Sequence, residues 1–515
     1  MSVLATSSHN LALRYHDPAS DRRAAITILA LAAVFAFIPA VVLQSPSLLL
    51  LAAAGLAALI LVEPWVGLLS ILAVLGIDAA SFDPVTGGLE PVLLPLQGIL
   101  ATPAELLVLW TTLAAGIRTV SERRSLVSDP MLMSAAAIFG LLVLGGVVLG
   151  AVNGSDLTIA LWEVRSLLLI PLVMLATSMI LKPEHLKYLA LALAGVLAFM
   201  SLEAFWRYVT YVRPGTLDVS EDFAFGHETA VLTGLLMVMG IAWWLWGPNR
   251  GQRYGAALLA LFAAIVLLTM QRRAGVIAGE AGILTIALFL LLTHWRRFLV
   301  VAPIGVVFAA IYLSVFWNDP NSFGQPARAF RTIFLSAEVD ARDQASDEYR
   351  RIETFNIWRN IESAPVEGLG FGTVYAKPEP LPDLSSFWPF WEYIAHNTML
   401  WLWMKGGLLT FGAFWFLLGA AIARLVAISR ATDSGLAIAA SATCGAFICM
   451  SVLYAYVDLG LVNTRMMLAL GLCLGLVGVV QRLASEHPPQ IPKEGSTRDP
   501  SISNHMHARP PRPHW

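Results

Sequence analysis

The chain has 515 residues, of which 57% are hydrophobic and 13% charged, with a net charge of −2 and a mean hydropathy of +0.70. Soluble domains carry about 25% charged residues, so this composition excludes a soluble domain and indicates a membrane protein with several spans. No basic domain for nucleic acid is visible. Cys444, Cys449 and Cys473 lie in apolar segments without metal-type spacing, which indicates neither disulfides nor a metal site.

Apolar segments follow a polar N-terminal tail at 1–23 and continue along most of the chain. A membrane-spanning helix needs about 20 residues. The sequence predicts about fourteen such helices, near 24–43, 47–62, 64–78, 99–117, 131–152, 160–181, 186–210, 228–246, 255–270, 274–293, 298–316, 395–425, 436–456 and 463–481. The second and third are short and separated by Glu63-Pro64, so one broken hairpin or a re-entrant pair is the alternative.

The expected fold is therefore an all-α polytopic membrane protein with about 12–14 transmembrane helices. The helices form a bundle at 24–316 and a C-terminal group at 395–481. A large, partly helical outer loop at 317–394 separates these two parts. A disordered tail at 482–515 completes the chain.

Basic residues distinguish the two faces of the predicted bundle, because short cytoplasmic loops are enriched in Lys and Arg. One face collects Arg22, Arg23, Arg118, Arg123, Arg124, Lys182, Lys187, Arg250, Arg253, Arg296, Arg297, Arg424, Arg430 and Arg482. The opposite loops, including the long one, are rich in Asp and Glu. Both termini are therefore expected in the cytoplasm.

The long outer loop contains a predicted helix near 347–361. Its apolar residues recur every three positions: Tyr349, Ile352, Phe355, Trp358 and Ile361. This spacing indicates a helix that lies on the membrane or on the bundle. Gly368, Gly370 and Gly372 favour a turn with tight backbone packing over a phosphate loop. The aromatic cluster at 387–391 is typical of a membrane interface, with a sugar-stacking platform as the alternative.

His396-Asn397 lies where the outer loop returns to an apolar segment, followed after nine residues by Gly407 and then by Thr410. If the topology is right, His227 and His396 are the only histidines on the outer face. An imidazole can take and return a proton near neutral pH. His396 is therefore the candidate catalytic base, with Asn397 and Gly407 as supporting residues, and His227 ranks below it as a helix cap.

Two arginine pairs interrupt the acidic outer face: Arg272-Arg273 between two predicted helices, and Arg350-Arg351 in the long loop. A planar guanidinium can bond two oxygens of a diphosphate at once. Snorkelling to lipid phosphates is the alternative for the first pair, and ion pairs with neighbouring carboxylates for the second. With His396, these arginines indicate a site for a glycosyl diphosphate donor, and no metal ligand cage or cofactor is indicated.

With these residues the chain resembles the O-antigen ligase and polymerase superfamily of bacterial envelope enzymes. The likeness rests on the His396 motif, on Arg273-Ala274-Gly275, and on Arg350 followed by Pro365-x-x-Gly368-x-Gly370-x-Gly372. Arg273 and Arg350 are favoured over Arg272 and Arg351 as the matching arginines. Together these motifs span about 270–410, and elsewhere the likeness is limited to hydropathy.

The resemblance implies a metal-independent, inverting glycosyltransferase of the bacterial inner membrane with its active site in the periplasm. Its donor would be a glycan on undecaprenyl diphosphate, and its acceptor a hydroxyl of lipid A core or of another glycan. His396 would remove the acceptor proton, a role worth about 10²–10⁴-fold in rate, and Arg273 and Arg350 would stabilise the departing diphosphate. A ligase is the first expectation, a polymerase of O-antigen or exopolysaccharide repeats the alternative, and a transporter the expectation from a different class.

Overall fold

The computed structural model describes residues 46–77, 92–94, 101–213, 226–270, 272–319, 322–335, 341–386 and 388–488. These residues form helices, turns and loops and no β-strand, which confirms the all-α polytopic fold. The N-terminal tail, the predicted first membrane helix at 24–43 and the tail beyond 488 lie outside the described residues.

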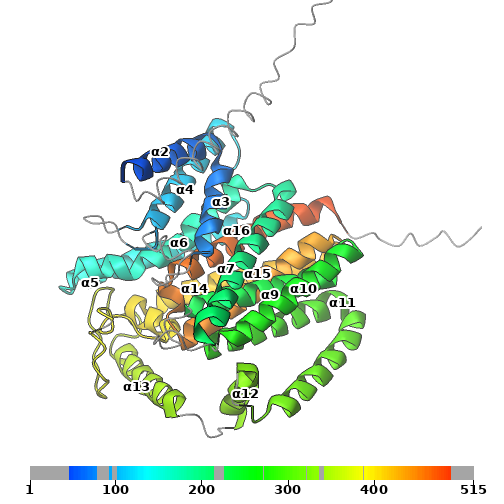
Figure 1. The fold of residues 1–515 in the computed structure, drawn as a ribbon. Helices are drawn as coiled ribbons and strands as arrows, with labels where there is room; N and C mark the ends of the chain where they lie inside the picture. The colour runs from blue at the N-terminus through cyan, green and yellow to red at the C-terminus, as the bar shows by residue number, and fades with distance from the viewer. Residues whose placement is uncertain are drawn as a thin grey trace, which may run out of the picture.

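The helices are arranged as a bundle (Figure 1). In chain order they are α2 (Pro46–Val62), α3 (Pro64–Leu75), α4 (Pro103–Ser121), α5 (Pro130–Val152), α6 (Leu157–Ile180), α7 (Leu186–Arg207), α9 (His227–Trp246), α10 (Arg250–Thr269), α11 (Arg273–Phe316), α12 (Gln325–Leu335), α13 (Ala341–Ser363), α14 (Thr398–Arg430), α15 (Gly435–Val457) and α16 (Thr464–Glu486). Within the described ranges, nine helices are long and apolar enough to cross a membrane: α5, α6, α7 with its short extensions, α9, α10, α11, α14, α15 and α16.

The predicted helices at 274–293 and 298–316 are continuous in α11, which is 44 residues long. Its backbone is non-helical at His294, where φ is −139° and ψ is 59°. At a rise of about 1.5 Å per residue, 44 residues extend about twice the thickness of a bilayer core. The kink therefore marks the place where the chain turns back, and α11 contains two predicted spans.

One end of the bundle gathers the residues singled out in the sequence. Helices α9, α11, α14 and α16 begin there, and α15 ends there. Bonds between these ends fix the arrangement: Thr398 bonds to Ala455 at the end of α15, and His227 at the start of α9 bonds to Asp458. Helix α13 lies at the same end, because Arg273 at the start of α11 bonds to Asp347 of α13. We call this the His396 end.

Helices α6 and α16 pack closely in the middle of the bundle. A Cβ atom on Gly475 of α16 would lie 2.6 Å from the Cβ atom of Thr177, and one on Gly471 would lie 2.9 Å from that of Val173. Small residues allow such an approach between helices in membranes, where van der Waals packing supplies much of the association energy. These glycines therefore set the spacing of the two helices.

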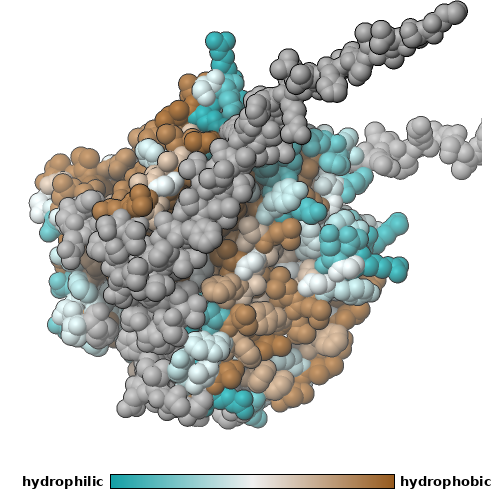
Figure 2. Space-filling view, turned by 45° about the horizontal axis from the view of Figure 1, so that its top comes forward, coloured by the Kyte–Doolittle hydropathy of each residue, from teal (hydrophilic) through white to brown (hydrophobic). Residues whose placement is uncertain are grey.

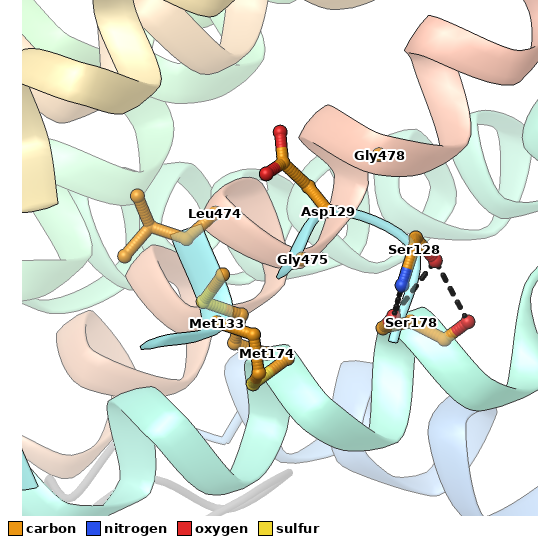
Figure 3. Close-up of a pocket in the computed structure, with 8 residues that line it drawn as sticks. All are labelled: Ser128, Asp129, Met133, Met174, Ser178, Leu474, Gly475 and Gly478. Carbon is orange, nitrogen blue, oxygen red and sulfur yellow. Dashed lines mark hydrogen bonds between the residues drawn. The ribbon is translucent and has the colours of Figure 1, made fainter. Parts of the chain in front are cut away.

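At the opposite end from His396, the start of α5 meets the ends of α6 and α16 around a small pocket (Figure 3). Ser128 and Ser178 close one side of it, since the backbone N–H of Ser128 donates to Oγ of Ser178 at 2.8 Å. Asp129 also lines the pocket and caps α5 by accepting two backbone N–H groups. None of the candidate site residues lines this pocket.

Large apolar side chains remain exposed along several helices. Leu141 on α5, Leu284 and Phe308 on α11, and Leu258 on α10 each have about two thirds of their surface exposed. Figure 2 shows broad hydrophobic areas on one face, with hydrophilic residues gathered towards its right-hand edge. An exposed apolar surface of this extent is expected for helices that face lipid, where all backbone groups are bonded within the helix.

Candidate active site

His396 is the second residue before α14, and the start of that helix fixes its backbone. Asn397 is the N-cap, and its side chain accepts the backbone N–H of Leu400 at 3.1 Å. The hydroxyl of Thr398 donates to the carbonyl groups of Ala455 at 2.9 Å and of Asp458 at 3.0 Å. The capping residue and the anchored threonine therefore hold His396 against the end of α15.

Gly407 breaks α14 three turns after His396, with φ at 73° and ψ at 178°. A left-handed φ favours glycine, and a Cβ atom here would lie only 2.1 Å from the carbonyl oxygen of Val366. The break leaves two carbonyl groups of α14 for the loop: Leu369 N donates to Met404 O at 2.8 Å, and Gly370 N donates to Lys405 O at 3.0 Å. Gly407 thus supports the site by letting the loop dock into the helix.

The glycine run at 368–372 is the part of the loop that packs against this break in α14. Gly368, Gly370 and Gly372 all have positive φ, at 76°, 84° and 81°. Their backbone passes between α14 and α5, where a Cβ atom on Gly370 would lie 2.3 Å from the backbone nitrogen of Gly150. The run is therefore a packing turn, as the sequence favoured, and its amide groups at 369–372 bond to protein acceptors.

A buried ion pair between α14 and α6 holds the loop in place. Lys405 of α14 and Glu163 of α6 have fully buried side chains, with Nζ 3.1 Å from Oε1. Lys405 also donates to the carbonyl group of Thr373, and Glu163 accepts the backbone N–H of Gly372. Both charges therefore have hydrogen-bonding partners in the loop, as buried charges require.

Glu353 of α13 holds the catalytic candidate. Its carboxylate accepts the backbone N–H of His396 at 2.9 Å and lies 3.2 Å from the imidazole Nδ1. The Glu353 side chain is 1% exposed and that of His396 is 23% exposed. The rings of Tyr349 and Trp388 flank the imidazole at 5.6 and 5.9 Å between centroids. With Nδ1 occupied by Glu353, Nε2 is the nitrogen left for a substrate.

Charges around His396 shift its pKa upward from 6.5. Burial lowers the pKa, but the hydrogen bond and charge of Glu353 and the charge of Asp458 raise it more, while Arg350 opposes them. The imidazole is thereby a stronger base than a free one. Its neutral form is correspondingly favoured only at higher pH.

His227 and Asp458 form a second histidine–carboxylate pair. Nδ1 of His227 lies 2.5 Å from Oδ2 of Asp458, whose side chain is 5% exposed. Burial raises the pKa of Asp458, but the hydrogen bond and charge of His227, with the charges of Arg350 and His396, lower it to about 2. His227 is the first residue of α9, whose N-cap is Gly226 rather than His227. Its side chain bonds instead to the carboxylate of Asp458, the residue that follows α15.

The structure separates the members of the Arg350-Arg351 pair. Arg351 is exposed and pairs with Glu348 at 2.8 Å and Glu379 at 3.4 Å. Arg350 is half-buried, and its charge acts on both His396 and Asp458. Within the described ranges, no hydrogen bond or ion pair engages its guanidinium. Arg350 is therefore the arginine placed beside the catalytic candidate.

The first arginine pair lies at the start of α11. Arg273 donates to both carboxylate oxygens of Asp347 on α13, at 3.0 and 3.2 Å. Asp347 remains 42% exposed. Arg272 is buried, and it lies close enough to Tyr454, near the end of α15, for the two side chains to interact electrostatically. Arg273 thus ties α11 to the helix that holds Glu353 and Arg350.

Helix α13 extends beyond the predicted helix, and its buried face differs from the predicted apolar stripe. Phe355 and Trp358 are 40% and 45% exposed, whereas Asn356 and Asn360 are buried. Both asparagines bind the backbone of the following loop: Asn360 exchanges two hydrogen bonds with Ala376, and Asn356 exchanges two with the backbone of Glu379. The buried face thus combines Ile357 and Ile361 with asparagines that hold the loop.

The aromatic cluster packs back onto the protein. Trp388 contacts His396, and the ring of Phe390 stacks on Trp162 of α6 at 3.7 Å. Nζ of Lys377 lies 3.1 Å from the ring centroid of Trp391. Phe387 lies outside the described residues. These contacts place at least one aromatic ring of the cluster at the site.

A family model described as O-antigen ligase matches residues 256–415 of this chain. This part of the chain is therefore similar to the O-antigen ligase superfamily. This confirms the resemblance drawn from the motifs, and with it an O-antigen ligase or polymerase type of function in general terms. No curated protein sequence matches the chain closely enough to count as a relative.

The part that matches the O-antigen ligase family includes Arg273, Arg350 and His396 but not His227 or Asp458. Reasoning from the sequence assigned Glu353 and Asp458 no role at the site, although both carboxylates lie against histidines in the structure. Glu353 lies two positions after Arg351 in a helix rich in charged residues, so from its neighbours in the sequence it would be expected at the surface. Only the fold reveals that it is buried.

Proposed function

We propose that this chain is an inner-membrane glycosyltransferase that moves a glycan from undecaprenyl diphosphate to an acceptor hydroxyl at the periplasmic face, as an O-antigen ligase does. The observation that carries the proposal is the His396 imidazole, which is bonded at Nδ1 to a buried carboxylate. Nearby lies Arg350, which no hydrogen bond or ion pair engages within the described part of the chain. The basic loops at the opposite end support the orientation.

The reaction begins at Nε2 of neutral His396, which takes the proton of the acceptor hydroxyl as its oxygen attacks C1 of the donor sugar. The bond between C1 and the diphosphate oxygen breaks on the opposite face, so the configuration inverts. The proton then passes from His396 to solvent. Glu353 stabilises the imidazolium that forms, because its carboxylate accepts the Nδ1 hydrogen.

The leaving diphosphate carries away the bonding electrons, and the arginines stabilise its charge. Arg350 is placed beside His396 and Asp458 for this role. Arg273 joins it when the diphosphate displaces Asp347, whose side chain is 42% exposed. Fixed positive groups of this kind contribute about 10²–10³-fold each. Because the guanidinium groups supply the positive charge, the proposal includes a metal-independent reaction.

The test is transfer by the purified full-length protein in liposomes that contain a glycan on undecaprenyl diphosphate and a defined acceptor. We expect undecaprenyl diphosphate to be released as a new glycosidic bond forms, with inverted configuration by NMR. His396→Ala should reduce the rate by about 10²–10⁴-fold without changing thermal unfolding. Movement of the lipid across the membrane without bond formation would contradict the proposal.

The acceptor used by the wild-type protein distinguishes a ligase from a polymerase, since both use the same donor chemistry. Attachment of one finished chain to lipid A core indicates a ligase. Growth of products by successive repeat units on undecaprenyl diphosphate indicates a polymerase. His185→Ala is the matched control, because His185 lies beside Glu184 at the opposite end of the bundle and should leave either reaction unchanged.

A further inference from the structure

The His227–Asp458 pair has no part in the mechanism above, although it lies against the same site. Its carboxylate is almost fully buried, while the His227 side chain is 39% exposed. Oδ1 of Asp458 accepts the backbone N–H of Leu459 at 2.8 Å, and Oδ2 lies 2.5 Å from Nδ1 of His227. The aspartate is thus a buried anchor for an accessible imidazole.

Backbone contacts bring this pair next to His396. The hydroxyl of Thr398 bonds to the carbonyl group of Asp458 at 3.0 Å, and the N–H of Thr398 bonds to the carbonyl group of His396 at 2.8 Å. One residue thereby connects the two histidine–carboxylate pairs. The charge of Arg350 acts on members of both, since it influences the pKa of Asp458 and of His396.

With Nδ1 bonded to Asp458, the imidazole of His227 has Nε2 left, and no hydrogen bond within the described part of the chain engages that nitrogen. Arg350 is equally unengaged there. When protonated, an imidazole that donates from Nδ1 to a carboxylate has a second N–H at Nε2, and an anionic oxygen can accept from this N–H and from a guanidinium.

We propose that His227, oriented by Asp458, binds the diphosphate of the lipid-linked donor together with Arg350. This inference rests on the proposed function, because it assigns a further contact to the same donor. His227 is then a binding residue and Asp458 a positioning residue. The second histidine of the outer face thereby acquires a role distinct from that of His396.

Two substitutions separate the two nitrogens of His227. The amide nitrogen of asparagine lies near the position of Nδ1, so His227→Asn keeps a donor for Asp458 and removes the distal one. The amide nitrogen of glutamine lies near Nε2, so His227→Gln keeps a distal donor and removes the bond to Asp458. A structural role predicts that asparagine is the better replacement, whereas diphosphate binding predicts glutamine.

The measurement is the Kd of farnesyl diphosphate for the purified full-length protein in detergent, with thermal unfolding recorded for each variant. His227→Asn should weaken binding about tenfold, as expected for a lost charge-assisted bond, and His227→Gln should retain more affinity than His227→Asn. Equal affinities of the two variants, or tighter binding by His227→Asn, would overturn the inference. Inorganic diphosphate, measured in parallel, should show the same order if the diphosphate group itself is recognised.

The wild-type protein separates this inference from the proposed function. If it neither transfers glycan nor binds farnesyl diphosphate, the proposed function fails whatever the variants do. If it does both and His227→Asn binds as tightly as wild type, only the role of His227 fails. His185→Asn and His185→Gln are the matched controls and should both bind like wild type, because His185 lies at the other end of the bundle.

Discussion

The α6–α16 packing and the loop around His396 are held together by different forces. Helix α16 is apolar and almost wholly buried, and its glycines meet α6 at van der Waals distance. The loop is fixed by buried polar groups, among them Lys405, Glu163 and Glu353. Packing is non-directional, whereas hydrogen bonds and ion pairs define a geometry. The bundle therefore supplies stability, and the polar contacts supply the positions that the proposed chemistry requires.

The largest effect should come from breaking the buried ion pair beneath the loop. Lys405→Met leaves the Glu163 carboxylate buried without its partner, which costs about 3–5 kcal/mol. We expect a large fall in the thermal unfolding temperature in detergent and loss of transfer, because the loop also loses the hydrogen bond from Lys405 to the carbonyl group of Thr373. The double variant Lys405→Met/Glu163→Gln should recover part of the stability, since no unpaired charge remains.

The control for that prediction is an exposed pair at the other end. Arg118 of α4 and Glu122, the residue that follows this helix, lie 2.9 Å apart, with both side chains partly exposed. Surface pairs contribute about 0–1 kcal/mol, so Glu122→Gln should leave unfolding almost unchanged. Similar losses from Lys405→Met and Glu122→Gln would show that buried charges do not distinguish the loop from the rest of the bundle.

A smaller effect should follow from closing the break in α14. Gly407→Ala places a side chain at positive φ and against the carbonyl group of Val366, at a cost of about 1–3 kcal/mol. The loop should then shift from Met404 and Lys405, with transfer reduced at least tenfold. Gly412 is the matched control on the same helix, because a Cβ atom there meets nothing within 4 Å. Gly412→Ala should retain activity; equal losses in both variants would contradict the docking role of Gly407.

The sequence predicted the helices better than the contacts that make the site. The sequence predicted two helices on either side of the kink in α11, because polar residues lie around His294 and one bilayer span limits the length of an apolar helix. It did not predict the break at Gly407, because this break depends on a loop whose backbone amide groups bond to the carbonyl groups of α14. Pairing of Lys405 with Glu163 likewise depends on how two distant helices meet, which no local pattern records.

Helix α13 shows the same limit within one element. Its apolar residues predicted a helix at 347–361, and α13 spans Ala341–Ser363. A repeat of three residues drifts around a helix of 3.6 residues per turn, so Phe355 and Trp358 end up exposed. Glu353 and Asn356 are buried because partners in the loop satisfy them, and those partners are known only after folding.

The pH dependence of transfer should test the electrostatic role of Glu353. In the proposed reaction His396 acts as a base when it is neutral, so the rate should rise with pH through its pKa, which is raised from 6.5. Glu353→Gln keeps an oxygen acceptor for Nδ1 but removes the charge that raises this pKa. The rising limb of kcat/KM against pH should therefore move to lower pH, and the maximum should fall by less than about tenfold. An unchanged limb would mean that another group controls the rate.

The smallest effect is expected for substitution of Arg351. Comparing it with Arg350 tests whether the position of a guanidinium within the loop matters. Arg350 and Arg351 are adjacent and carry the same charge, but only Arg350 is placed to influence His396 and Asp458. Arg351 is 59% exposed and binds Glu348 and Glu379 at the surface, where such pairs contribute about 0–1 kcal/mol. Arg351→Ala should change the transfer rate by less than about twofold, whereas Arg350→Ala should reduce it about 10²–10³-fold. A comparable loss from both substitutions would mean that net positive charge on the loop, rather than a guanidinium at one position, binds the donor.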